Sequence, residues 1–343
     1  MPSVGIAGAS GYAGAELIRL VHGHPDFELA VIAAGSNAGS TLAQVHPQFS
    51  SVPDLASMVF ADTTAAALTG LDLVFLALPH GHSAALASEL PESVRIVDLG
   101  ADFRLEDAHQ WVTYYGGAHA GSWTYGMPEV RGLRSQVAIS SRVANPGCYA
   151  TAITLGLAPL LEEGLAEPND IIVVAASGTS GAGRNAKVNL LGSEVMGSMS
   201  TYKVGGTHQH TPEIEQTLGR VAGGDVHINF TPLLAPMPRG ILATLSVKTK
   251  ASETQLRSAL ENYYADETFV SVLPAGQLPV TGSTLGSNAV HIQVAKDERL
   301  GRATVIVAID NLIKGAAGQA LQNANIMYGF TEALGLSTIG VAP

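Results

Sequence analysis

The stretch Val4-Gly5-Ile6-Ala7-Gly8-Ala9-Ser10-Gly11-Tyr12-Ala13-Gly14 decides the fold of this chain. Its first four residues are small or apolar and predict a buried strand, and residues 15–22 that follow have a helical period. A glycine-rich turn between a strand and a helix lets the backbone approach a pyrophosphate at the helix N-terminus. The spacing G-x-x-G-x-x-G differs from the commoner G-x-G-x-x-G. A close helix–strand crossing without a ligand is therefore the alternative interpretation.

Outward from this turn, short apolar runs alternate with helical stretches. Strands are predicted at residues 29–34, 71–78 and 95–99, which is typical of a doubly wound, Rossmann-like parallel sheet. From about residue 171 the pattern changes to strands with few helices between them. These later strands are predicted at residues 171–175, 227–231, 241–248, 269–273, 290–294 and 303–309. We therefore expect a second α+β domain built on a largely antiparallel or mixed sheet.

Composition excludes several classes of protein. The 343 residues are 46% hydrophobic and 14% charged, which indicates compact domains rather than disorder. With 18 basic and 29 acidic residues the net charge is −11, which disfavours binding to nucleic acid or to an anionic membrane. The first basic residue is Arg19, and no run approaches the roughly 18 apolar residues of a spanning helix. We expect a cytoplasmic protein without a membrane partner.

The second predicted strand bears on the choice of cofactor. It ends in Ala33-Ala34-Gly35-Ser36-Asn37, with no acidic side chain to bind a ribose 2′-hydroxyl. The small loop leaves room for a 2′-phosphate, so NADP(H) is favoured over NAD, although the loop carries no arginine. Pro79 and His80 follow the third strand, where we expect the backbone to lie along the cofactor. His82 is expected to be a solvated loop residue.

The chain holds a single cysteine, Cys148, which excludes an internal disulfide, a zinc ribbon and an iron–sulfur cage. It follows Asn145-Pro146-Gly147 and precedes a helical stretch that we expect to stop at Gly164. Unpaired N–H groups and the dipole at a helix N-terminus stabilise a thiolate. A nucleophile is therefore favoured over the alternative of a buried structural cysteine.

Two histidines, His208 and His210, are candidates for the proton-handling partner that a nucleophilic cysteine needs. Thr211 is predicted to be the N-cap of a helix and Pro212 its first residue, so that both histidines precede the helix. A metal site is disfavoured because no third ligand lies nearby in the sequence. Surface histidines without a role are the other alternative.

Six ordered motifs extend over essentially the whole chain. They are residues 8–14 (GASGYAG), 101–105 (ADFRL), 145–149 (NPGCY), 177–184 (SGTSGAGR), 208–213 (HQHTPE) and 310–320 (DNLIKGAAGQA). Together they resemble the N-acetyl-γ-glutamyl-phosphate reductase family, relatives of aspartate-semialdehyde dehydrogenase. The departures are small: Ala13 stands where relatives often have Thr, and Ala150 where they often have Pro.

The resemblance implies that Cys148 attacks an acyl phosphate and forms a thioester, which NADPH reduces to the semialdehyde of arginine biosynthesis. His210 is then expected to be the acid/base, with His208 as the alternative. Glu213 is expected to orient the imidazole or the substrate amide. Arg104 is the first candidate for the substrate carboxylate, because a guanidinium binds one bidentately, with a salt bridge to Asp102 or Glu106 as the alternative.

The remaining expectations combine these motifs with the strand ends and with the few cations of the chain. A further substrate contact is expected from Asn145, and Arg184, Lys187 and Arg239 are weaker candidates than Arg104 for contacts with phosphate or substrate. Cofactor contacts are expected from Gly8, Ser10, Gly11, Tyr12, Ala13, Ser36, Pro79, His80, Ser177, Gly178, Gly181, Asn311 and Gly318. The expected domains are residues 1–147 with 312–343 for NADP binding, and residues 148–311 for catalysis and oligomerisation.

The expected partners are a small acyl phosphate or aldehyde, inorganic phosphate, and further copies of the chain in a homodimer or homotetramer. Three alternatives remain open at this point. The first is a sibling reductase that acts on aspartyl or aminoadipyl phosphate. The second is an NADP dehydrogenase acting on a hydroxyl group, and the third is a non-catalytic NADP-binding regulator.

Overall fold

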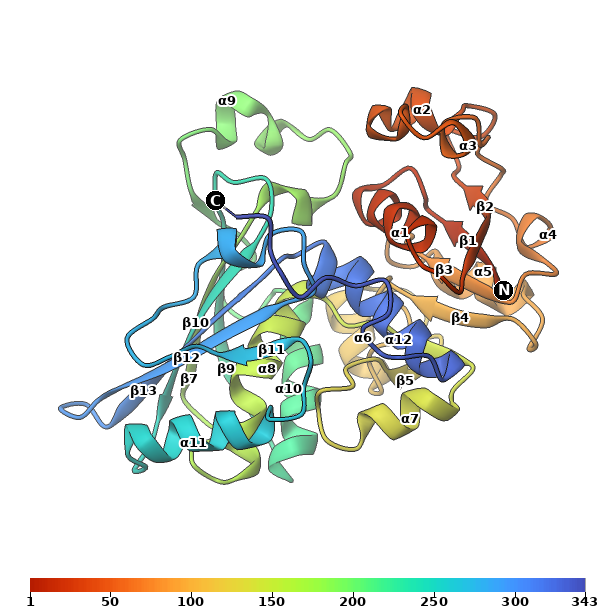
Figure 1. Ribbon diagram of the computed structural model, residues 1–343. Helices are drawn as coiled ribbons and strands as arrows, with labels where there is room; N and C mark the ends of the chain where they lie inside the picture. Colours follow the sequence, from red (N-terminus) through yellow and green to blue (C-terminus); the bar gives the residue numbers. More distant parts are fainter. Residues whose placement is uncertain (343) are drawn as a thin grey trace. The chain divides into compact units, whose positions relative to one another are not determined.

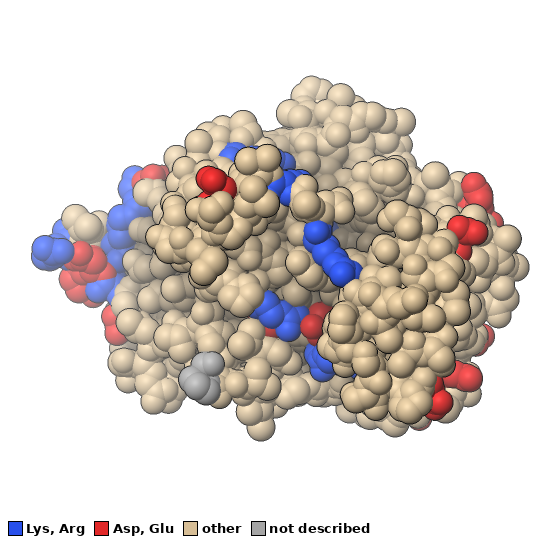
Figure 2. All heavy atoms as spheres, turned by 90° about the horizontal axis from the view of Figure 1, so that it is seen from above, with Lys and Arg blue, Asp and Glu red and all other residues tan. Residues whose placement is uncertain are grey.

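The computed structural model describes residues 1–342, which divide into two compact units. Unit 1 consists of residues 1–146 and 316–336, and unit 2 of residues 147–315 together with the segment from Ser337 onward. No helix among residues 1–342 is long and apolar enough to cross a membrane. On the face drawn in Figure 2, Lys and Arg side chains form small separate groups, several of them beside acidic side chains.

Unit 1 is built on a six-stranded sheet in the order β2-β1-β3-β4-β6-β5, and its strand pairs are parallel (Figure 1). The strands are β1 (Ser3–Ala7), β2 (Glu28–Ala33), β3 (Leu73–Leu76), β4 (Arg95–Asp98), β5 (Thr124–Tyr125) and β6 (Arg142–Ala144). All four residues of β3 are buried, as expected of a strand covered on both faces. The predicted Rossmann-like sheet is confirmed.

Helices connect these strands, and α1 is the one that follows the glycine-rich turn. The longer helices are α1 (Tyr12–His22), α5 (Ser83–Glu89), α6 (Ala108–Tyr114), α7 (Leu133–Ile139) and α12 (Gly318–Tyr328). The short ones are α2 (Leu42–Val45), η1 (Pro47–Phe49), α3 (Pro53–Ala56) and α4 (Ala65–Leu68). Helix α1 buries Leu17, Ile18, Leu20 and Val21, the apolar positions that its sequence period predicts.

Unit 2 contains a seven-stranded mixed sheet in the order β11-β12-β13-β10-β7-β9-β8. The strands are β7 (Ile171–Ser177), β8 (Ser200–Thr201), β9 (Ile228–Leu234), β10 (Ile241–Lys248), β11 (Val270–Val272), β12 (Val290–Asp297) and β13 (Arg302–Ile309). Neighbours from β12 to β7 pair antiparallel, whereas β11–β12 and β7–β9 are parallel. The predicted mixed sheet of the second domain is confirmed.

Helix α8 (Cys148–Glu162) is the centre of unit 2, and its residues 149–161 are all buried. It packs on the sheet at Gly156, where an added Cβ would lie 2.4 Å from Leu245 and 2.8 Å from Val307. The other elements of the unit are α9 (Gly192–Val195), α10 (His210–Ala222), α11 (Glu253–Tyr263), η2 (Thr179–Ala182), η3 (Val188–Leu190) and η4 (Thr281–Thr284). A π-helical turn, η5 (Ile313–Ala317), precedes α12. The packing of α8 fixes the place of its first residue, Cys148.

Candidate active site

Cys148 is the first residue of α8, as the sequence predicts. Gly147 is the N-cap and has extended backbone angles, so the chain turns into the helix directly before the cysteine. The backbone of Gly315 packs against Cys148, because a Cβ added to Gly315 would lie only 2.7 Å from the Cys148 Cβ. The half-buried thiol therefore lies at the positive end of a long helix, which stabilises a thiolate.

Helix α10 brings Glu213 and His210 to the same place. The fully buried Glu213 accepts a hydrogen bond from the Gly147 N–H through its Oε1 at 2.8 Å. The His210 ring lies against the Gly147 Cα, because a Cβ added there would be 2.4 Å from His210 Nε2. A glycine at position 147 is thus required for the imidazole to lie directly beside the cysteine loop.

The start of α10 differs from the prediction. The helix begins at His210, so the prediction that Thr211 is the N-cap and Pro212 the first residue is wrong. The N-cap is Gln209, whose side chain makes no capping bond. The preceding residue accepts the first N–H groups: His208 Nδ1 accepts the His210 N–H at 3.0 Å, and the His208 carbonyl accepts the Thr211 N–H at 2.9 Å. Thr211 is already inside the helix, so its hydroxyl does not serve as the cap.

His208 is buried among aromatic rings, with Tyr149, Tyr202 and Phe230 in edge-on contact. Burial, and next the neighbouring His210, lower the pKa of His208 to about 2. Its imidazole is therefore neutral near pH 7. Because Nδ1 accepts a backbone hydrogen bond, the ring proton is on Nε2. A neutral capping imidazole positions the backbone and is poorly suited to proton transfer.

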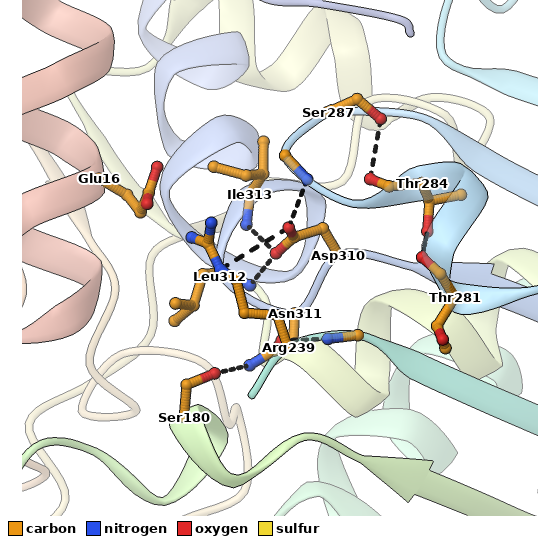
Figure 3. Close-up of polar contacts among 12 residues, drawn as sticks. Glu16, Ser180, Arg239, Thr281, Thr284, Ser287, Asp310, Asn311, Leu312 and Ile313 are labelled. Carbon is orange, nitrogen blue, oxygen red and sulfur yellow. Dashed lines mark hydrogen bonds and ion pairs between the residues drawn. The ribbon is translucent and has the colours of Figure 1, made fainter. Parts of the chain in front are cut away.

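Figure 3 shows a second polar cluster of unit 2, around Asp310 and Asn311 after β13. Asn311 accepts the Gly240 N–H at 2.7 Å and donates to the Ser180 hydroxyl at 3.0 Å. The Arg239 Nε lies 3.8 Å from Asp310 Oδ2, and the Arg239 side chain is 22% exposed. Asn311, predicted to contact the cofactor, thus holds two loops together through its amide.

The loop at Ser177–Gly183 is paired with the residues before β10. The N–H groups of Gly178, Thr179 and Ser180 donate to carbonyls of Gly240, Met237 and Pro238. A Cβ on Gly178 would lie 2.7 Å from the Arg239 backbone, so the close approach requires glycine. Ser177 is buried, whereas Gly181, Arg184 and Lys187 are exposed.

Unit 1 carries the glycine-rich turn at the carboxyl end of β1. Gly8 has a φ of +79°, and a Cβ on it would lie 2.2 Å from the Ala77 carbonyl oxygen. A Cβ on Gly14 would lie 2.5 Å from the Gly8 oxygen. No side chain caps α1 at its N-cap residue, Gly11. The turn therefore forms a backbone cradle at a helix N-terminus, which fits the phosphates of a dinucleotide.

Comparison with known proteins assigns both units. Residues 3–138 match the semialdehyde dehydrogenase NAD binding domain, and residues 148–311 match the semialdehyde dehydrogenase dimerisation domain. N-acetyl-gamma-glutamyl-phosphate reductases of Acidothermus cellulolyticus and Frankia casuarinae are 58% and 57% identical, over 99% of this chain and 99% of theirs. The chain belongs to the N-acetyl-γ-glutamyl-phosphate reductase family.

Solved structures show the same fold at low identity. Aspartate semialdehyde dehydrogenase II of Vibrio cholerae aligns with a TM-score of 0.71 at 14% identity, over 96% of this chain and 98% of that one. The Candida albicans enzyme gives 0.68 at 16%, again over 96% and 98%. Family membership confirms the predicted oxidoreductase and its use of NADP(H). It also supports oligomerisation and a small-molecule substrate.

Two of the predicted substrate contacts, Arg104 and Asn145, make hydrogen bonds within unit 1. Arg104 is 4% exposed and donates to the backbone carbonyls of Asn145 and Leu99, at 2.8 and 2.7 Å. The buried Asn145 amide donates to the Ala316 carbonyl and accepts from Asn323. These contacts join the carboxyl ends of β4 and β6 to α12.

The other predicted cofactor residues of unit 1 differ in exposure. Ser10 and Ala13 are half-buried beside the glycine cradle, and Tyr12 is 40% exposed. Ser36, Pro79 and His80 are exposed, and the His80 ring contacts Tyr115 with centroids 5.2 Å apart. Gly318, the first residue of α12, is buried.

Two residues that hold these loops were not predicted to do so from the sequence. A ring nitrogen of the buried His46 lies 3.1 Å from the Ala9 carbonyl, inside the glycine cradle. The Asp102 carboxylate accepts the N–H groups of Gly81 and Ala84, which fixes the loop after β3 at the start of α5. The ADFRL motif pointed to Asp102, whereas no sequence signal identified His46.

Proposed function

We propose that this chain reduces N-acetyl-γ-glutamyl phosphate with NADPH to N-acetylglutamate 5-semialdehyde and phosphate. The observation that carries the proposal is the arrangement at Gly147, where Cys148 begins a long helix and Glu213 and His210 contact the preceding residue. It supplies a nucleophile and an adjacent base, which covalent catalysis at an acyl group requires. The named relatives share this chain's whole length.

In the first step, His210 takes the thiol proton and the Cys148 sulfur attacks the acyl carbon. The carbon–oxygen bond to phosphate breaks, and the leaving oxygen takes the bonding electrons together with the proton held by His210. The product of this step is a thioester on Cys148. Glu213 keeps the Gly147 backbone in place, so the thiol and the imidazole stay adjacent during the transfer.

The thioester is the group that makes reduction possible, since a thioester accepts hydride whereas a carboxylate does not. The glycine-rich turn of unit 1 (Gly8, Gly11 and Gly14) would hold NADPH, and the bound cofactor would supply the hydride. The tetrahedral hemithioacetal then collapses, the carbon–sulfur bond breaks, and the Cys148 thiolate leaves with the bonding pair. A proton from water restores the thiol, which closes the cycle.

Two cations of unit 2 are assigned to the anionic substrate. Arg239 is partly exposed and lies next to Asp310, and the exposed Arg184 directly follows the Ser177–Gly183 loop. Arg104 and Asn145 are assigned to supporting the carboxyl edge of the unit 1 sheet, because their polar atoms contact its backbone. A chain of net charge −11 needs such locally placed cations to bind an anion.

The test is the reverse reaction with purified protein. N-acetylglutamate semialdehyde, NADP and phosphate should give NADPH absorbance, and omission of phosphate should abolish it. Cys148→Ser should be inactive while still binding NADPH, which separates a lost nucleophile from a lost fold. Turnover without phosphate, or full activity of Cys148→Ser, would contradict the proposal. Faster turnover of aspartate semialdehyde would assign the chain to a sibling reaction.

The oligomer is proposed to be a homodimer or homotetramer formed through the sheet of unit 2. On β7, Ile172 and Val174 are 42% and 36% exposed, while alternate residues of the strand are buried against the helices. An apolar exposed sheet face is typical of a subunit interface. Light scattering during gel filtration should give two or four chain masses.

We also propose that the enzyme works in the cytoplasm, where its thiol stays reduced.

A further inference from the structure

We propose that Asp310 is a positioning residue of this site. Its buried carboxylate orients Arg239 and fixes the turn that places Gly315 against Cys148. The inference rests on the proposed function in one respect, the assignment of Arg239 to the substrate anion. Neither the comparisons nor the sequence motifs assign a role to Asp310.

The Asp310 carboxylate joins two distant segments of unit 2 (Figure 3). It is fully buried directly after β13, and its Oδ1 accepts the N–H groups of Leu312 and Ile313 at 2.8 and 3.1 Å. Its Oδ2 accepts the Gly286 N–H at 2.7 Å. One oxygen thus fixes the start of η5, and the other fixes the loop after η4. Three backbone donors hold the carboxylate in a single orientation.

Arg239 lies on the Gly286 side of this carboxylate, with Nε 3.8 Å from Oδ2. That distance is too long for a hydrogen bond, so the attraction is between charges in a largely dehydrated setting. The neighbouring Asn311 holds the Gly240 N–H at 2.7 Å. Two neighbouring side chains after β13 therefore act on two neighbouring residues before β10. Asn311 fixes the backbone of Gly240, and Asp310 attracts the guanidinium of Arg239.

The same turn reaches the nucleophile. The Asp310 carbonyl accepts the Gly315 N–H at 3.0 Å, and the Gly315 Cα packs on Cys148. Residues 313–317 form a π-helical turn, a feature that is frequent at functional sites. A displacement of Asp310 would thus move both the cation and the backbone beside the thiol.

Asp310→Asn is the informative change, because the amide has nearly the same shape and no charge. One side of an amide presents an oxygen and the other an NH₂ group, so Asn cannot accept N–H donors on both sides. We expect KM for phosphate in the reverse reaction to rise about tenfold, with a smaller fall in kcat. Arg239→Met should raise the same KM to a similar extent.

The double variant distinguishes positioning from a separate structural effect. If Asp310 acts through Arg239, Asp310→Asn in the Arg239→Met background should change KM for phosphate by less than about threefold. Asp170→Asn is the matched control, because Asp170 pairs with Arg302 and Lys248 on the surface of the same unit. This control should leave KM unchanged.

A binding measurement without turnover completes the test. Inorganic phosphate should slow alkylation of Cys148 by iodoacetamide in the wild type and in Asp170→Asn, and should protect neither Asp310→Asn nor Arg239→Met. The proposal would be overturned if the two single changes raised KM for phosphate multiplicatively in the double variant. It would also be overturned if phosphate fully protected Cys148 of Asp310→Asn against alkylation. If Asp310→Asn does not fold, an unchanged KM in Arg239→Met alone overturns it. Phosphate-independent turnover by the wild type would instead contradict the proposed function.

Discussion

The Nε2 edge of His210 lies 2.4 Å from the position that a Cβ on Gly147 would occupy. Real Cβ atoms do not approach a ring nitrogen so closely, so the absence of a side chain at residue 147 permits this placement of the imidazole. Gly147 also donates its N–H to Glu213. One glycine thereby sets the relation between the proposed nucleophile, Cys148, and the proposed base.

Gly147→Ala should therefore inactivate the enzyme without unfolding it. The methyl group displaces the His210 ring by about 1 Å or more, and misplacement on that scale costs about 100-fold in kcat. Gly224→Ala is the control in the same unit, because nothing lies within 4 Å of a Cβ there. The reverse-reaction kcat and the thermal midpoint are measured for both variants. An active Gly147→Ala enzyme would mean that His210 is not the base.

His208 should make the free energy of unfolding decrease as the pH falls. Its pKa is lowered to about 2 in the folded chain, from 6.5 when exposed, so below pH 6.5 the unfolded state binds a proton that the folded state does not. Stability is lost as the pH falls, by about 2 kcal/mol between pH 7 and pH 5. Urea unfolding of the wild type and His208→Gln at both pH values checks this. Equal losses in the two proteins would refute the assignment.

Asp98 of unit 1 should make the free energy of unfolding fall as the pH rises, which is opposite to the effect of His208. Burial raises the pKa of its carboxyl from 3.8 to about 6, despite hydrogen bonds from the Ser83 hydroxyl and the Gly100 N–H. The folded state therefore binds the proton more tightly, and the stabilisation present at low pH is lost as the pH rises through 6. In the wild type this group should change the free energy of unfolding by about 2–3 kcal/mol between pH 4 and pH 8, and Asp98→Asn should remove that change. The readout is the wild-type minus variant difference in unfolding free energy; a flat difference would be the contrary result.

Gly14→Ala should weaken cofactor binding through the backbone. The added Cβ would lie 2.5 Å from the Gly8 carbonyl oxygen, so α1 must move away from the cradle. NADPH affinity, measured by nicotinamide fluorescence, should fall about tenfold or more. Gly23→Ala, at the other end of α1, is the control because its Cβ would make only ordinary van der Waals contacts, at 3.5 and 3.8 Å. Unchanged affinity in Gly14→Ala would place the dinucleotide elsewhere.

Local sequence was sufficient to predict the framework of both units. The glycine-rich turn between an apolar strand and an amphipathic helix predicts the start of unit 1, because helix periodicity and glycine's freedom are properties of neighbouring residues. Asn145-Pro146-Gly147 before a helical stretch likewise places Cys148 at a helix N-terminus, where the structure has it. The ordered motifs added the family, which the comparisons confirm.

Side-chain partners, in contrast, were decided by contacts between distant segments. The sequence predicts Arg104 to be a substrate cation but does not reveal that its guanidinium donates to the backbone carbonyls of Asn145 and Leu99, which only the fold brings together. Thr211 is predicted to be the N-cap, but Gln209 takes that position and Nδ1 of the buried His208 accepts the N–H of His210.

The sequence by itself thus determined which residues begin the strands and helices and which one carries the thiol, since those depend on local backbone preferences. Only the tertiary structure decided that Glu213, His210 and Gly315 converge on residues 147–148. It also decided that Asp310 faces Arg239. The reason is physical: buried polar groups take whichever partner the packed elements bring within hydrogen-bonding distance, and local sequence does not specify that partner.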